Sequence, residues 1–230
     1  MKNIFLQVLL LFLIAIAFSS QAVAQNRNFT TSLSLGIGSS GFDLEESVVG
    51  DAKRIFYPMG GIQFQKRLSP KWALTVFPNV GMSGNEREFT LSVGSLENQT
   101  IKSTSAFLNL AVHPKYFFNK LFYLSAGPEL SYLLWNYGSA YNGDERIYNV
   151  KETNFFNRVN LLVSSSVGIS MKVAESRKNA PVQIDALWYL EFRFKKGLTN
   201  ILNQEALGTD KTTSIIAFEL VTGISFASKK

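Results

Sequence analysis

Apolar and polar residues alternate along residues 122–134, FYLSAGPELSYLL. One face of this run is almost wholly apolar, while the other is small, polar or charged apart from Tyr123 and Leu133. A period of two is typical of a β-strand with one apolar face. The run is longer than the roughly five or six residues of an ordinary globular strand, and it has the length of a tilted strand that crosses a membrane.

Seven further segments repeat this alternation. They are residues 29–38, 56–68, 72–83, 103–117, 159–171, 182–195 and 213–226. Short polar turns at 69–71, 118–121 and 174–181 alternate with long polar links at 39–55, 84–102, 136–157 and 196–212. Periplasmic turns and longer extracellular loops follow each other in this way in bacterial outer-membrane barrels. The sequence therefore predicts an all-β fold, an eight-stranded antiparallel up-and-down transmembrane β-barrel.

Alternation alone does not say which face of the barrel points outward. A soluble, lipocalin-like barrel would turn the apolar face inward around a ligand. Two features favour the membrane form. The polar face carries Gly, Ser, Asn and single charges, which suit a narrow lumen, and aromatic residues gather near strand ends, as in interfacial girdles. The predicted girdles are Trp72, Tyr116, Phe117, Phe118, Phe122 and Tyr123 beside the turns, and Phe56, Tyr57, Trp135, Tyr137 and Phe194 beside the long links.

The first residues have the pattern of an export signal. Lys2 precedes an apolar run at residues 4–18, and Ala22-x-Ala24 forms a small-residue cleavage site. We expect a signal peptide at 1–24 and an outer-membrane β-barrel domain at 25–230. An uncleaved membrane anchor is the alternative, but the apolar run is short for a span. The chain has no cysteine, so the exported fold uses no disulfide.

Charge and composition argue against several kinds of site. The net charge of +6 is spread over loops and turns, and no basic stripe indicates a nucleic-acid partner. With one histidine and no cysteine, we expect no metal ion and no cofactor. The acidic stretches Asp43-x-Glu45-Glu46 and Asp144-Glu145 are interpreted as solvated loop charges rather than calcium sites.

Charged residues on the inward face are the candidate site. They are Arg67, Lys115, Glu129, Asp185, Glu191, Arg193, Lys195 and Glu219. An eight-stranded barrel is barely wide enough for its own side chains, and an unpaired buried charge is costly. We therefore expect a salt-bridged network that plugs the lumen, formed by Arg67, Lys115, Glu129, Glu191, Arg193 and Glu219. The alternatives are an ion-selective pathway and an acid/base couple of Glu129 with Glu219.

The only histidine, His113, limits the enzymatic possibilities. A Ser-His-Asp hydrolase would have to use this residue. It falls on the inward face of a strand that carries no acidic residue nearby in sequence. We expect the protein not to be an enzyme.

Three short motifs resemble the PorT-like outer-membrane β-barrel family. They are HPKYF at residues 113–117, FYLSAGPELSYLL at 122–134 and GLTNI at 197–201. The chain departs from the family pattern before GLTNI, where Phe194-Lys195-Lys196 stands in place of an aromatic. The resemblance implies an eight-stranded barrel in the outer membrane of a Gram-negative cell. A founding member takes part in protein secretion, but no residue here encodes that role.

Three hypotheses for function remain open. The first is a structural or interaction barrel that is embedded in outer-membrane lipid and presents links 39–55, 84–102, 136–157 and 196–212 to an extracellular or envelope protein. The second is a small passive, porin-like channel. The third, suggested by the resemblance alone, is an accessory component of a secretion system.

Overall fold

The computed structural model describes residues 29–44, 52–89, 99–142, 145–151, 153–174, 183–202 and 213–229. The predicted signal peptide, residues 1–24, lies outside these ranges. The described residues form β1 (Phe29–Leu44), β2 (Ala52–Arg67), β3 (Trp72–Phe89), β4 (Gln99–Phe117), β5 (Phe122–Asn142), β6 (Glu145–Lys151), the 3-10 helix η1 (Thr153–Phe155), β7 (Val159–Ala174), β8 (Gln183–Gly197) and β9 (Thr213–Lys229). In this part of the chain, no helix has the length and apolar character needed to cross a membrane.

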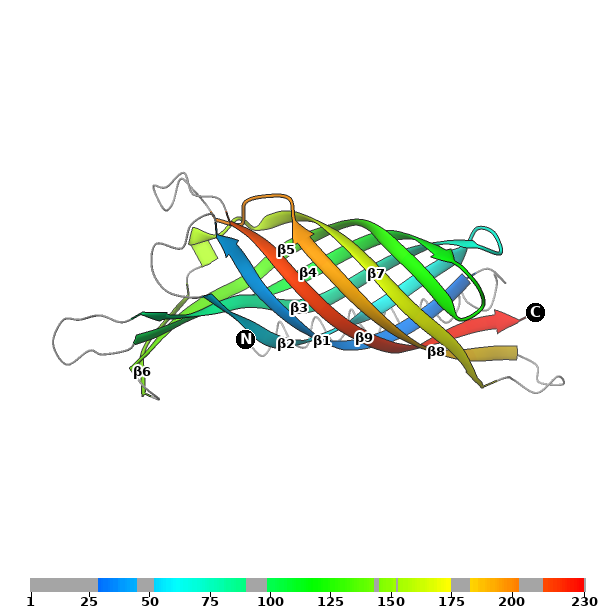
Figure 1. Ribbon diagram of the computed structural model, residues 1–230, viewed down its shortest axis with the longest axis horizontal. Coiled ribbons are helices and arrows are strands. Elements are labelled where there is room, and N and C mark those ends of the chain that lie inside the picture. The colour runs from blue at the N-terminus through cyan, green and yellow to red at the C-terminus, as the bar shows by residue number, and fades with distance from the viewer. Residues whose placement is uncertain are drawn as a thin grey trace.

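Eight of the strands close into one antiparallel barrel (Figure 1). Closure comes from β1 and β9, which pair from Thr30↔Ala227 to Leu44↔Thr213. The strand β6 stands outside the ring, because it pairs only with the Tyr137–Asn142 end of β5, whereas β7 pairs with β5 from Phe122 to Tyr132. The predicted fold class, an eight-stranded antiparallel transmembrane barrel, is confirmed.

The two faces of the wall differ as the alternation requires. Leu35 is 64% exposed on the outside, while Glu129 is 1% exposed inside the barrel. Most other large outward side chains are aliphatic or aromatic, and many buried inward ones are Ser, Asn or charged. This is the reverse of a soluble barrel and suits a wall surrounded by lipid.

The barrel has a turn end and a loop end. The turn end holds the β2–β3 and β4–β5 turns, the first residue of β1 and the last of β9. Both turns are closed by a side-chain oxygen that accepts backbone N–H groups. Asn119 Oδ1 accepts from Leu121 N at 2.7 Å and Phe122 N at 2.8 Å, and Ser69 Oγ accepts from Trp72 N at 3.1 Å. Such local bonds explain why Asn and Ser favour tight turns.

At the loop end the strands run past their predicted ends. β1 continues to Leu44, β3 to Phe89 and β5 to Asn142, so the predicted links 39–55, 84–102 and 136–157 are corrected at their edges. The backbone ladder persists there, with Phe89 paired to Gln99 and Gln99 to Asn142. A strand that has left the lipid meets water on both faces. It therefore loses the apolar alternation while it keeps its hydrogen bonds.

The wall is taller on one side than on the other. Most of the predicted link 136–157 is the upper part of β5, the strand β6 and η1 rather than an open loop. β6 is exposed along its whole length and projects beyond the barrel at the left of Figure 1. Next to it the wall is lower, because β7, which pairs with β5, begins only at Val159, and β8 ends at Gly197. We call the high part, made of β3 to β6, the raised wall.

Candidate functional site in the barrel lumen

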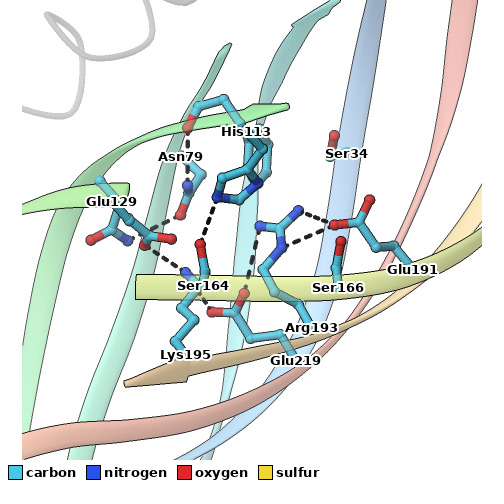
Figure 2. A network of polar contacts seen from close by, with 12 residues as sticks. Ser34, Asn79, His113, Glu129, Ser164, Ser166, Glu191, Arg193, Lys195 and Glu219 are labelled. Carbon is cyan, nitrogen blue, oxygen red and sulfur yellow. Dashed lines mark hydrogen bonds and ion pairs between the residues drawn. The ribbon is translucent and has the colours of Figure 1, made fainter. Parts of the chain in front are cut away.

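Five charged side chains form a continuous chain of contacts in the middle of the lumen, which we call the central network (Figure 2). Lys195 Nζ lies 2.7 Å from Glu129 Oε1 and 2.9 Å from Glu219 Oε1. The Arg193 guanidinium donates to Glu191 Oε1 from Nη2 at 2.7 Å and from Nε at 3.1 Å. Its Nη1 lies 3.7 Å from Glu219 Oε2. Glu219 thus joins the two halves of the network.

Strand periodicity positions these side chains. Glu191, Arg193 and Lys195 occupy alternate residues of β8 and therefore share its inward face. Glu219 faces Arg193 directly across the β8–β9 ladder. Glu129 comes from β5, beyond β7, and the inward residues of β7 include the small Ser164 and Ser166, which leave room for Lys195 to reach it.

Lys115 brings the buried charges into balance. Its Nζ lies 4.0 Å from Glu191 Oε2 and 4.1 Å from the centre of the Tyr123 ring. With Lys115, three cations face three carboxylates, Glu129, Glu191 and Glu219, inside the barrel. Balance matters because an uncompensated charge in this setting would cost several kcal/mol, roughly 3–5 when one partner of a buried pair is removed.

The structure thus brings together five of the six expected network residues and adds Lys195, which was expected only to face inward. Arg67 lies elsewhere. It is the last residue of β2, where it is exposed, and its guanidinium lies 4.3 Å from the centre of the Phe117 ring. There it donates to Pro70 O at 2.7 Å, since a side chain at the barrel mouth can reach the turn and solvent. Asp185 is also apart, 3.3 Å from Lys172 near the turn end.

Three inward tyrosines were not among the expected network residues. Each lies directly opposite a glycine of the neighbouring strand, in the pairs Tyr57↔Gly38, Tyr123↔Gly168 and Tyr189↔Gly223. A Cβ on any of these glycines would overlap the tyrosine ring, so the glycine is what lets the ring lie flat on the wall. Tyr57, Tyr123 and Phe117, which were predicted for the membrane girdles, are buried inside instead.

The tyrosine hydroxyls connect the wall to the central network. Tyr57 donates to Glu219 Oε1 at 3.1 Å, and Tyr123 donates to Glu191 Oε2 at 3.0 Å. Tyr189 is hydrogen-bonded to Ser34 Oγ. Opposite pairing of a tyrosine and a glycine could be found in the sequence only if the strand register were already known.

A second set of polar side chains continues the network around the lumen. His113 Nε2 lies 2.6 Å from Ser164 Oγ. Asn109 donates to Asn79 Oδ1 at 3.0 Å and accepts from Ser131 Oγ at 2.6 Å. These contacts satisfy polar groups that the closed barrel removes from water.

Apolar side chains close the lumen at the loop end. We call this group the apolar cap, and its members are Phe107, Leu133, Leu162, Ile201, Ile215 and Ala217. Five of them project inward from strands, but Ile201 enters from the segment after β8 and is only 1% exposed. Ile201 lies in the predicted link 196–212, so the first part of that link is a folded segment. Residues 203–212 lie outside the described ranges.

Backbone bonds hold Ile201 in place. Its N–H donates to Thr213 O at 2.8 Å, and its carbonyl accepts from Asn157 N at 2.7 Å. The neighbouring Asn200 uses Oδ1 to accept from Thr213 N at 2.9 Å and Leu202 N at 3.1 Å. The GLTNI motif of the sequence therefore forms the segment whose hydrogen bonds hold Ile201 inside the barrel.

Two cavities flank the central network. The one beside the apolar cap has a volume of about 20 Å³ and is lined by residues that include Phe107, Glu129 and Lys195. The other measures about 220 Å³ and reaches the turn end at Arg67 and Lys120. A water molecule occupies roughly 30 Å³ in the liquid. Among the described residues, the cavity beside the cap therefore has room for about one water molecule, while the cavity toward the turns is about ten times larger.

Metal binding finds no support in the described part of the chain, where no three His, Cys, Asp or Glu side chains gather closely enough to hold an ion. Of the two acidic stretches, Glu45, Glu46 and Asp144 lie outside the described residues.

A closed barrel with a lipid-facing apolar exterior and a filled polar interior defines an outer-membrane β-barrel protein. Residues 20–203 match the family described as "Outer membrane protein beta-barrel domain", so the chain belongs to this family and the protein resides in the outer membrane. A comparison with curated protein sequences finds no match.

Solved outer-membrane proteins resemble the chain at low sequence identity. Ail of Yersinia pestis, in complex with the heparin analogue sucrose octasulfate, is 9% identical with a TM-score of 0.43, over 86% of this chain and 99% of that one. The Neisserial surface protein A is 11% identical with a TM-score of 0.35, over 86% and 96%. OprG of Pseudomonas aeruginosa is 15% identical with a TM-score of 0.33, over 89% and 98%.

Proposed function

We propose that this protein is a non-conducting barrel, anchored in outer-membrane lipid, that presents its loop end to an extracellular or envelope protein. The observation that carries the proposal is the double closure of the lumen. Charged side chains fill its middle, and Ile201 with its apolar neighbours fills the loop end. A barrel filled in this way uses its interior for stability and leaves its outer surface for recognition.

The raised wall is the surface that we propose for recognition. β6 exposes Ile147, Tyr148 and Val150, side chains large enough to anchor a protein contact. Charged groups lie on the same raised wall, where Arg146 donates to Tyr141 Oη at 3.1 Å and Lys102 lies 2.7 Å from Glu86. A polar rim around apolar anchors is the usual composition of a protein interface.

The proposal assigns the loop end to the cell exterior and the turn end, with both ends of the barrel domain, to the periplasm. It includes cleavage of the signal peptide after Ala24. The narrower PorT-like membership and a secretion role rest only on the motifs at 113–117, 122–134 and 197–201.

We also propose that the protein is not an enzyme. His113 does contact Ser164, the arrangement that a hydrolase would need. Ser164 has no exposed surface, however, and His113 is buried beside it, so a substrate has no approach to the pair. We interpret the contact as one of the hydrogen bonds that satisfy buried polar groups in the lumen.

Single-channel recording in planar bilayers tests the filled lumen. We expect no conductance steps from the wild-type barrel or from Glu129→Gln, Glu191→Gln and Glu219→Gln. Stepwise conductance of the wild type would replace this proposal with the passive channel. Heat-modifiable migration in detergent gels verifies that each variant folds as a barrel.

Photo-crosslinking in intact cells tests the recognition surface. A photoreactive residue in place of Tyr148 on β6 should yield protein adducts, while the same residue in place of the lipid-facing Val163 should yield none. A third probe at Lys71 reports on the turn end. Adducts at Lys71 alone would contradict loop-end recognition and favour an accessory role in secretion.

A further inference from the structure

The cavity at the turn end, which we call the vestibule, has a composition that the filled lumen does not explain. Its volume is about 220 Å³, and its walls include Gln63, Arg67, Lys115, Lys120, Tyr189 and Ser225. Arg67 and Lys120 stand at the mouth, where both are exposed, and Lys115 lies at the inner end, buried against Tyr123.

The described walls of the vestibule carry three cations and no carboxylate. The nearest acid to Lys115, Glu191, lies behind it and is already engaged at short range. Arg193 donates to Glu191 at 2.7 Å and Tyr123 at 3.0 Å, whereas Lys115 Nζ stays 4.0 Å away. Lys115 therefore balances the buried charge of the lumen and still has N–H donors for another acceptor.

Among the described residues, the other turn-end charges lie outside the vestibule wall. Asp185 is 3.3 Å from Lys172 and is not part of the vestibule wall. The neutral wall residues add amide and hydroxyl groups, among them Gln63 and Ser225, and both of these are buried. An anion entering the vestibule would meet positive charge at both ends and hydrogen-bond donors between them.

We propose that the vestibule binds a small anion whose charged group is a carboxylate or a phosphate. Charge-assisted hydrogen bonds to ammonium and guanidinium groups recognise both groups. The volume equals that of about seven water molecules at roughly 30 Å³ each, so one charged head group fits and a folded polymer does not. This site lies at the opposite end from the proposed recognition surface and does not depend on it.

Isothermal titration of the folded barrel in detergent micelles tests the site with defined probes. These are inorganic phosphate, N-acetyl-Ala-Ala with a free carboxylate, and the same dipeptide as its amide. We expect saturable binding of one or both anions, weakened by added salt, and none of the amide. Which anion binds more tightly identifies the source of the ligand.

Variants locate the binding. The double change Arg67→Gln with Lys120→Gln removes both mouth cations from exposed positions, so the barrel should fold. Each charge-assisted bond that is lost should lower the affinity by about tenfold. Lys115→Met should abolish binding, with heat-modifiable migration as the check on folding.

Lys71→Gln is the matched control, because Lys71 is an exposed turn residue outside the vestibule wall. It should leave the affinity unchanged. The proposal is overturned if no anion binds saturably, if the amide binds equally well, or if Lys71→Gln weakens binding as much as the mouth variants do.

Discussion

The two halves of the lumen are built from the same strands and filled by different means. Toward the turns, hydroxyl, amide and charged side chains surround a cavity of about 220 Å³. Toward the loops, apolar side chains close on Ile201 and leave about 20 Å³. The central network separates the two, with Tyr57 bonded to Glu219 on one side and Tyr123 to Glu191 on the other.

The position of an inward residue along its strand, and not only the face that it occupies, decides what its side chain does. Phe107 and Leu133 occupy the same face as the polar residues Asn109 and Ser131, but nearer the loop end. Burial of such side chains is favourable by about 1.5–3 kcal/mol each. Apolar packing therefore closes one half, while ion pairs hold the middle and the turn half keeps a cavity of about 220 Å³.

The largest effect should come from the middle of the lumen. Arg193→Met leaves Glu191 and Glu219 without a guanidinium partner, and both carboxylates are buried. We expect a loss of about 3–5 kcal/mol in the free energy of unfolding, measured by urea titration in micelles with tryptophan fluorescence.

Lys172→Met is the control for Arg193→Met, since it also removes an ion pair but from a side chain that is 41% exposed. Its cost should be no more than about 1 kcal/mol. Equal costs for the two variants would mean that the central network is not what holds the barrel together.

The apolar cap should be the next most sensitive region. Ile201→Ala removes a buried side chain and should cost about 2–4 kcal/mol in the same titration. Leu198→Ala changes the same segment at a side chain that is 59% exposed, so its effect should stay within about 0.5 kcal/mol. If Ile201→Ala costs no more than Leu198→Ala, packing around Ile201 does not stabilise the loop end of the barrel.

A smaller loss is expected where tyrosine lies on glycine. Gly168→Ala places a methyl group against the Tyr123 ring and should cost about 1–3 kcal/mol through overpacking. Gly81→Ala is the control, because its nearest neighbour, Met59 Cβ, would be 3.6 Å from the new methyl group. If the two variants lose the same free energy of unfolding in urea titration, the close fit of the tyrosine ring against the glycine does not stabilise the barrel.

The smallest effect on stability belongs to the turn end. Arg67→Gln alters an exposed side chain at the barrel mouth and should change the free energy of unfolding by less than about 0.5 kcal/mol. The same variant should bind anions more weakly. A loss of stability comparable to that of Arg193→Met would place Arg67 in the network after all.

The fold could be predicted because the barrel depends on a local signal. Alternation along residues 122–134 and seven similar segments specifies strands with one apolar face, and a wall in lipid needs nothing more specific. The extensions to Leu44, Phe89 and Asn142 could not be predicted in this way, because the alternation ends where the lipid ends.

The alternation alone places Glu129, Glu191, Arg193 and Glu219 on the polar face of their strands, and a wall surrounded by lipid turns that face inward. That Lys195 joins Glu129 to Glu219, and that Arg67 stays at the mouth, follows only from the way the strands pack in three dimensions. Register and closure set which inward residues meet across the lumen, and the fold back after β8 sets where Ile201 goes. These contacts join residues that are far apart in the chain, so no local sequence pattern predicts them.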